Sequence, residues 1–129
     1  MLLHLDNLTM GDLCTECVIS TLTDTLINEA VVRTYRRCVK TDPHSAFAPI
    51  RVGHYDAALF AASVLASHGM FINFAMSDMK DEHDAMVRES KGDYSPQDKR
   101  YFRAYARTLR DLIETIESFE HLHPTIFCN

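Results

Sequence analysis

The sequence lacks the short motifs that identify the common catalytic classes. It has no glycine-rich phosphate loop, no nucleophile elbow and no recognisable arrangement of serine, histidine and aspartate. It also shows no internal repeat, low-complexity segment or domain linker. A chain of 129 residues has the common size of one domain with its own core. We therefore predict a single domain, 1–129, without a diagnostic catalytic fingerprint.

Charge is also missing from the middle of the chain, because no Asp, Glu, Lys or Arg occurs between Asp56 and Asp78. A helix that is apolar on every side is enclosed by protein or by lipid, so this run predicts a central apolar helix over about 55–76. His68 and Asn73 interrupt the run and would be costly near the centre of a bilayer. We therefore expect other helices to enclose it and predict no membrane span.

The flanking segments predict an all-α fold, a compact bundle of four to five helices around this central helix. The first helix is expected to begin at Thr9, a residue that can cap its backbone. At 100° per residue, two apolar stripes in the first third of the chain point about 140° apart. These directions predict a helix break near Leu22 to Asp24, with Thr23 or Asp24 as the new cap.

Proline and glycine set the remaining boundaries. Two Xaa-Pro pairs predict an irregular segment over 41–53, whose apolar residues Phe47, Ile50 and Val52 fold back onto the core. Gly69 predicts a kink and not a reversal. Ser95 and Pro96 predict a helix start, and Pro124 its end. The apolar stripe of this last helix is Phe102, Tyr105, Leu109, Leu112, Ile116 and Phe119.

Composition and cysteine content bound the environment. The formal net charge of −5 disfavours sequence-independent binding to nucleic acid. Residues 1–8 lack a positive region followed by an apolar block, so we expect no secretory signal and a cytoplasmic location. Four cysteines in such a chain are expected to be reduced, without a structural disulfide.

Two cysteines lie three residues apart, a spacing that places both thiols on one helix face. Cys14 and Cys17, together with Cys38 and His44, could form a tetrahedral zinc site that stabilises a helical module. The alternative is that the cysteines are small core residues on an apolar stripe.

His83 and Asp84 are adjacent, with His54 before them and Asp111 after them. This order of ligands resembles the HD-domain metal phosphohydrolases, although Asp81 and Glu82 precede the pair where that family has an apolar run. The resemblance implies that the four residues bind a divalent cation, which activates water for attack on a phosphate. The alternative is a histidine on an apolar stripe beside a solvated acidic face.

Charged residues follow one side of the last helix, and we predict that they form an interaction surface. They are Arg100, Arg103, Arg107, Arg110, Asp111, Glu114 and Glu117. Basic residues in the first half and acids in the second half oppose the helix macrodipole. Three alternatives would offset that cost: pairing within the chain, an antiparallel second copy, or an anionic ligand. Pairing within the chain would involve i,i+4 neighbours and the preceding helix residues Asp78, Asp81 and Asp84.

Two smaller groups of residues complete the candidates. Arg33, Arg36, Arg37 and Lys40 suit the end of a helix, and with Arg51 they could also form a small anion-binding patch. Glu117 and His121, like Glu120 and His123, have spacings used in helical metal sites, but a charged helix end explains them as well.

Taken together, the sequence favours a small non-enzymatic helical protein without a cofactor. We expect it to bind another protein as a regulator, inhibitor or adaptor, with homodimerisation as one alternative. Compact charged helical proteins of this kind are common among phage and mobile-element products.

Overall fold

The computed structural model describes residues 15–69 and 71–127, with side chains described over 17–69 and 71–119. This part of the chain forms four α-helices and no strand: α1 (Thr15–Lys40), α2 (Ala48–His68), α3 (Ile72–Ser90) and α4 (Pro96–Phe127). The predicted all-α bundle is therefore confirmed. None of these helices combines the length and the apolar character that crossing a membrane requires.

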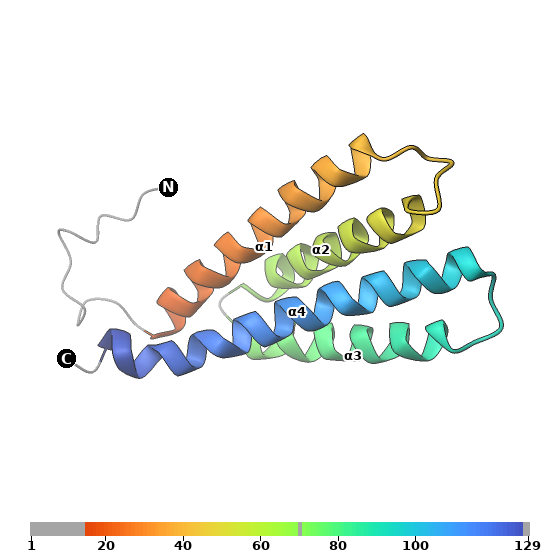
Figure 1. Cartoon of the computed structure of the whole chain (residues 1–129). Coiled ribbons are helices and arrows are strands. Elements are labelled where there is room, and N and C mark those ends of the chain that lie inside the picture. The colour runs from red at the N-terminus through yellow and green to blue at the C-terminus, as the bar shows by residue number, and fades with distance from the viewer. Residues whose placement is uncertain (1–14, 70, 128–129) are drawn as a thin grey trace.

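The helices form an up-and-down arrangement with a central pair (Figure 1). α2 and α4 run in the same direction and share the most extensive helix interface, while α1 and α3 run in the opposite direction. α1 packs mainly on α2, and α3 packs mainly on α4. The α2–α4 seam therefore holds the two outer helices together.

Small residues allow α2 and α4 to approach closely. Gly53 lies so near α4 that an added Cβ would be 2.7 Å from the carbonyl oxygen of Tyr101. Further along α2, Ala57, Ala58 and Ala61 are completely buried. Since a small side chain sets a short distance between helix axes, these residues fix the spacing of the seam.

The predicted boundary and apolar stripe of α4 are confirmed. The backbone N–H of Asp98 donates to Ser95 Oγ at 3.1 Å, which caps the first turn as expected. Four stripe residues are buried, and the two at its ends, Phe102 and Phe119, are half-buried. The buried four are Tyr105, Leu109, Leu112 and Ile116.

The prediction of one central helix over 55–76 was wrong, because this run belongs to two helices. α2 ends at His68 and α3 begins at Ile72, and the chain reverses between them (Figure 1). Gly69 has a φ of 59°, and its N–H donates to the Leu65 carbonyl at 2.9 Å. This left-handed conformation favours glycine and turns the chain, so Gly69 ends a helix where a kink was expected.

The predicted break in the first helix was also wrong, because α1 is continuous from Thr15 to Lys40. Thr23 is fully buried, and its hydroxyl donates to the Ile19 carbonyl at 2.7 Å. The stripe that faces the core is Thr23, Ile27, Ala30 and Thr34. A threonine that satisfies its own hydroxyl inside the helix can occupy a core position, and no cap is required there. The predicted start at Thr9 lies outside the described residues.

Two prolines that were expected to exclude or end a helix lie inside helices. Pro49 lies in the first turn of α2. Backbone N–H groups in the first turn have no acceptor within the helix, so the lack of an N–H in proline costs no hydrogen bond there. The irregular connection is therefore 41–47, shorter than predicted, and Phe47 and Val52 are exposed instead of folding onto the core. α4 also continues past Pro124 to Phe127. A proline so near the end of a helix removes a backbone hydrogen bond from the last turns alone.

The burial of Thr23 leads to a stability prediction. Thr23→Val is expected to raise the free energy of unfolding by about 1 kcal/mol, because an apolar methyl replaces a hydroxyl whose only partner is its own helix. Thr25 makes the same bond, to the Thr21 carbonyl at 2.9 Å, but is exposed. Thr25→Val is therefore the matched control and is expected to change stability little in urea denaturation. A large loss in Thr23→Val alone would contradict this account of the core stripe.

Candidate functional site

The predicted zinc ligands do not come together. Cys17 is disulfide-bonded, and this corrects the expectation that all four cysteines are reduced. Cys38 is free and lies near the other end of α1. At a rise of 1.5 Å per residue, Cys38 is about 30 Å from Cys17. His44 lies in the connection after α1, and Cys14 lies outside the described residues. One ion cannot bridge Cys17 and Cys38 across that length.

The four residues that resemble the HD ligands are distributed over three helices. His83 and Asp84 on α3 contact each other, with 3.0 Å between Nδ1 and Oδ1. His54 on α2 contacts Thr108 on α4, and Asp111 lies one turn further along α4. Within the described side chains, no three histidine, cysteine or acidic residues converge in a way that could hold a metal ion. The ligand order along the sequence is therefore not matched by a ligand cluster in space.

The seven charged residues predicted as an interaction surface on α4 are all exposed. Arg110 Nε lies 4.0 Å from Asp111 Oδ1, and Glu117 Oε2 accepts from Lys80 Nζ of α3 at 3.0 Å. Across side chains 17–69 and 71–119, Arg100, Arg103 and Arg107 form no ion pair.

The predicted pairing of these arginines with the α3 aspartates is not formed. Asp78 Oδ2 instead lies 2.7 Å from His68 Nε2, and Asp84 contacts His83. Pairing within the chain therefore leaves most of the positive charge on α4 unmatched. The second proposed metal pair, Glu120 and His123, and the residue His121 have side chains outside the described set.

Two tyrosine–carboxylate hydrogen bonds that the sequence did not indicate tie α4 to its neighbours. Tyr101 donates to Asp56 of α2 at 2.6 Å, and Tyr105 donates to Glu82 of α3 at 2.9 Å. Burial, followed by these hydrogen bonds, raises the pKa of both phenols well above the ordinary value. Both hydroxyls therefore stay protonated at neutral pH and serve as structural donors.

His54 lies in a basic environment. Its Nδ1 is 3.1 Å from Thr108 Oγ1, and the ring is half-buried. Burial lowers the pKa of His54, and the nearby charges of Arg51, Arg107 and Arg37 lower it further. Among the described side chains, Asp111 is the one whose charge raises the pKa of His54. His54 is therefore neutral at pH 7, with positive charge around it.

Large apolar side chains are exposed on one face of α1 and α2. Tyr35 and Tyr55 contact each other across the two helices, with ring centroids 5.6 Å apart. Apolar residues flank both tyrosines three positions before and four positions after, which places them on the same helix sides. We call this set of six residues the apolar face: Val32, Tyr35, Val39, Val52, Tyr55 and Leu59. Five of them are exposed and Tyr55 is half-exposed.

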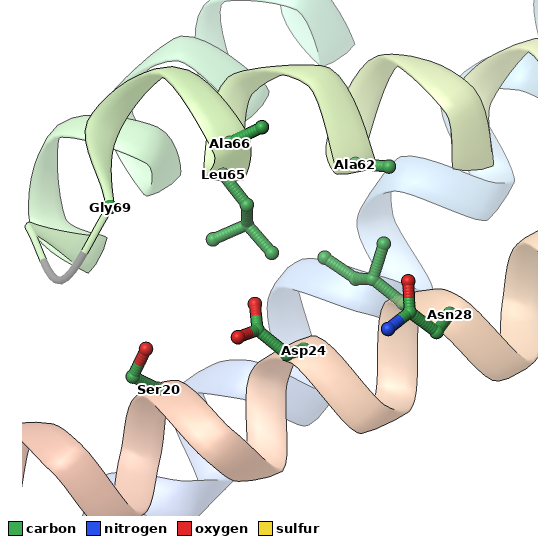
Figure 2. A pocket seen from close by; sticks show the side chains of 8 residues that line it. Ser20, Asp24, Asn28, Ala62, Leu65, Ala66 and Gly69 are labelled. Atoms are coloured by element: carbon green, nitrogen blue, oxygen red, sulfur yellow. The ribbon is translucent and has the colours of Figure 1, made fainter. Parts of the chain in front are cut away.

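A pocket of about 410 Å³ lies between the first half of α1 and the second half of α2. Figure 2 shows Leu65 pointing from α2 into this space, with Ser20 and Asp24 on the opposite helix. Its walls combine three polar residues of α1 with the apolar end of α2. Its volume lies within the range of small-molecule sites, but its lining holds a single charged group, Asp24.

Comparison of the chain with protein-family models, with curated proteins and with solved structures finds no match.

Proposed function

We propose that this chain is a small non-enzymatic helical protein that binds another protein through the apolar face, as a regulator, inhibitor or adaptor. The observation that carries the proposal is the exposure of large apolar side chains in two adjacent stripes, among them Val39 at 59% and Leu59 at 40%. Contiguous exposed apolar surface is typical of protein interaction sites.

The surroundings of the apolar face favour one kind of partner. A shallow hollow formed by α1 alone is lined by Asn28, Glu29, Val32, Arg33, Arg36 and Arg37. Three arginines against one acid leave net positive charge beside Val32 of the apolar stripe. An amphipathic helix with acidic residues beside its apolar stripe would match both features. Its apolar side chains would pack on the apolar face, and its acidic side chains would pair with the arginines.

The charged α4 residues support a second contact surface for the same partner. All seven are exposed, and three of the four arginines form no ion pair with described side chains. We propose this surface as an addition to the apolar face, where charge would steer association.

The chain is also proposed to be cytoplasmic, on the sequence argument. The disulfide at Cys17 opposes this location, since thiol systems keep cytosolic cysteines reduced.

Site-specific photo-cross-linking tests the proposal. A cross-linker at Val39, introduced in cells that produce the chain, is expected to trap a protein that a cross-linker at exposed Arg88 on α3 does not trap. The trapped protein is then purified, and its affinity is measured by calorimetry. Leu59→Glu is expected to weaken binding at least about tenfold, because a charge would be buried in the contact.

Several outcomes would contradict the proposal. One is equal trapping at Val39 and Arg88; another is an affinity that Leu59→Glu leaves unchanged. Trapping of a second copy of this chain, with a dimer mass in light scattering, would assign the apolar face to self-association instead. Arg88→Glu is the control variant, since it places the same charge on a different exposed helix face.

A further inference from the structure

The charges of arginines from three helices act on one imidazole, that of His54. His54 of α2 contacts Thr108 of α4 at 3.1 Å, and Arg107 immediately precedes Thr108. Arg51 lies three residues before His54 on α2, a spacing that places the two side chains on neighbouring positions of one helix face. α2 and α4 therefore each bring an arginine to His54.

α1 supplies the third arginine. The contact between Tyr35 and Tyr55 fixes the register of α1 and α2, which run in opposite directions (Figure 1). Arg37 follows Tyr35 by two residues, so it lies beside the part of α2 that precedes Tyr55, where His54 is located. Two residues also turn the helix by about 200°, so Arg37 points away from the side of α1 that carries Tyr35.

The positive charge of this group has little compensation. Across side chains 17–69 and 71–119, neither Arg37, Arg51 nor Arg107 forms an ion pair. Within the part of the chain whose side chains are described, the acidic group whose charge acts on His54 is Asp111. Three guanidinium groups and one carboxylate leave a net charge of +2 around the neutral His54, in a chain whose formal net charge is −5. The site thus has the charge opposite to that of the molecule as a whole.

We propose that Arg37, Arg51, Arg107 and His54 form a binding site for a phosphate group. Guanidinium groups match phosphate oxygens in paired hydrogen bonds, and a phosphate near its second ionisation carries close to two negative charges. A net charge of +2 therefore suits a phosphate better than a single carboxylate. Because Nδ1 is engaged by the Thr108 hydroxyl, Nε2 is the ring nitrogen left to contact a phosphate oxygen, and it donates in the tautomer that carries the proton there. Arg37 also lines the hollow beside the apolar face, but His54, Arg51 and Arg107 belong to α2 and α4, so the phosphate site goes beyond the proposed function.

Proton NMR of the histidine rings tests the site directly. The chain has seven histidines, and the spectrum of His54→Gln identifies the His54 signals. Inorganic phosphate, a phosphoserine peptide and acetate are titrated separately at constant ionic strength maintained with chloride. Phosphate is expected to shift the His54 signals in a saturable way and to raise the pKa of His54, since an anion favours the charged ring. Stronger binding of the phosphopeptide than of free phosphate would identify a phosphorylated protein as the source.

Matched arginine variants separate binding from general charge effects. Arg51→Gln and Arg107→Gln are each expected to raise the half-saturating phosphate concentration at least about tenfold. Arg88→Gln removes the same charge from exposed α3 and is expected to leave it unchanged. Circular dichroism confirms that each variant folds.

Three results would overturn the proposal: equal shifts with phosphate and chloride, equal or stronger shifts with acetate, or an equal loss in Arg88→Gln. If a site variant does not fold, the wild-type comparison of phosphate, acetate and chloride still decides. None of these results changes the expected cross-linking at Val39. The phosphate proposal can therefore be wrong while the proposed protein-binding function stands.

Discussion

Replacing Gly53 with alanine is expected to lower the free energy of unfolding, although the same change in most helix interiors raises it. An added Cβ would lie 2.7 Å from the Tyr101 carbonyl oxygen, 3.1 Å from Ala104 Cβ and 3.3 Å from the Tyr105 nitrogen. Two of these atoms belong to the α4 backbone, so no side-chain rotation relieves the contact. Overpacking of this kind costs about 1–3 kcal/mol, which exceeds the gain of about 1 kcal/mol from helix propensity.

Urea denaturation of Gly53→Ala and Gly53→Val measures the effect. Valine is expected to cost more than alanine, because its branches add further atoms at the same contact. Ser63→Ala, at an exposed position of the same helix, is the control and is expected to change stability by less than about 0.5 kcal/mol. A Gly53→Ala variant as stable as the wild type would mean that α2 and α4 are further apart than described.

Leu109→Ala is expected to lower the free energy of unfolding by about 3 kcal/mol. Leu109 is completely buried in the core cluster that includes residues of all four helices, so truncation removes apolar contacts and leaves a cavity. The position was predicted from the α4 stripe, and the variant tests that stripe directly.

Leu59→Ala is the matched control for Leu109→Ala. It makes the same chemical change on α2, but Leu59 is 40% exposed and belongs to the apolar face. Its expected loss is less than about 1 kcal/mol, because the side chain already contacts solvent. Equal losses at the two positions in thermal or urea denaturation would contradict the assignment of one leucine to the core and the other to the surface.

Local signals predicted α4 well because they act within one turn. Ser95 and Pro96 define its start through a side-chain cap and a fixed φ, and neither depends on distant residues. The apolar stripe through Leu109 is likewise a property of one helix. The helical class of the fold followed from such local patterns.

The wrong boundaries involve residues whose role depends on packing. Thr23 has the side chain of a cap, and only its burial against the other helices makes it a core residue. Gly69 and Pro49 are each compatible with several backbone paths, and tertiary contacts select one. The uncharged run 55–76 was interpreted as one element because the hydrophobic pattern does not record a reversal of direction.

The candidate sites were only partly accessible from the sequence. A patch of α1 arginines with Arg51 was recognised, but Arg107 and His54 join it through the contacts of three helices. The apolar face does have a pattern in the sequence, since Tyr35 and Tyr55 each have an apolar residue three positions before and four positions after them. The sequence alone, however, does not tell which of two apolar stripes on a helix is covered by other helices.

The order of folding follows from the place of the α2–α4 seam in the chain. α1 with α2, and α3 with α4, join segments that are neighbours in sequence, whereas the seam joins segments separated by the whole of α3. Contacts between distant segments require more loop-closure entropy and form more slowly. We therefore expect each pair of neighbouring helices to associate early and Gly53 to reach α4 only in the last, rate-limiting step.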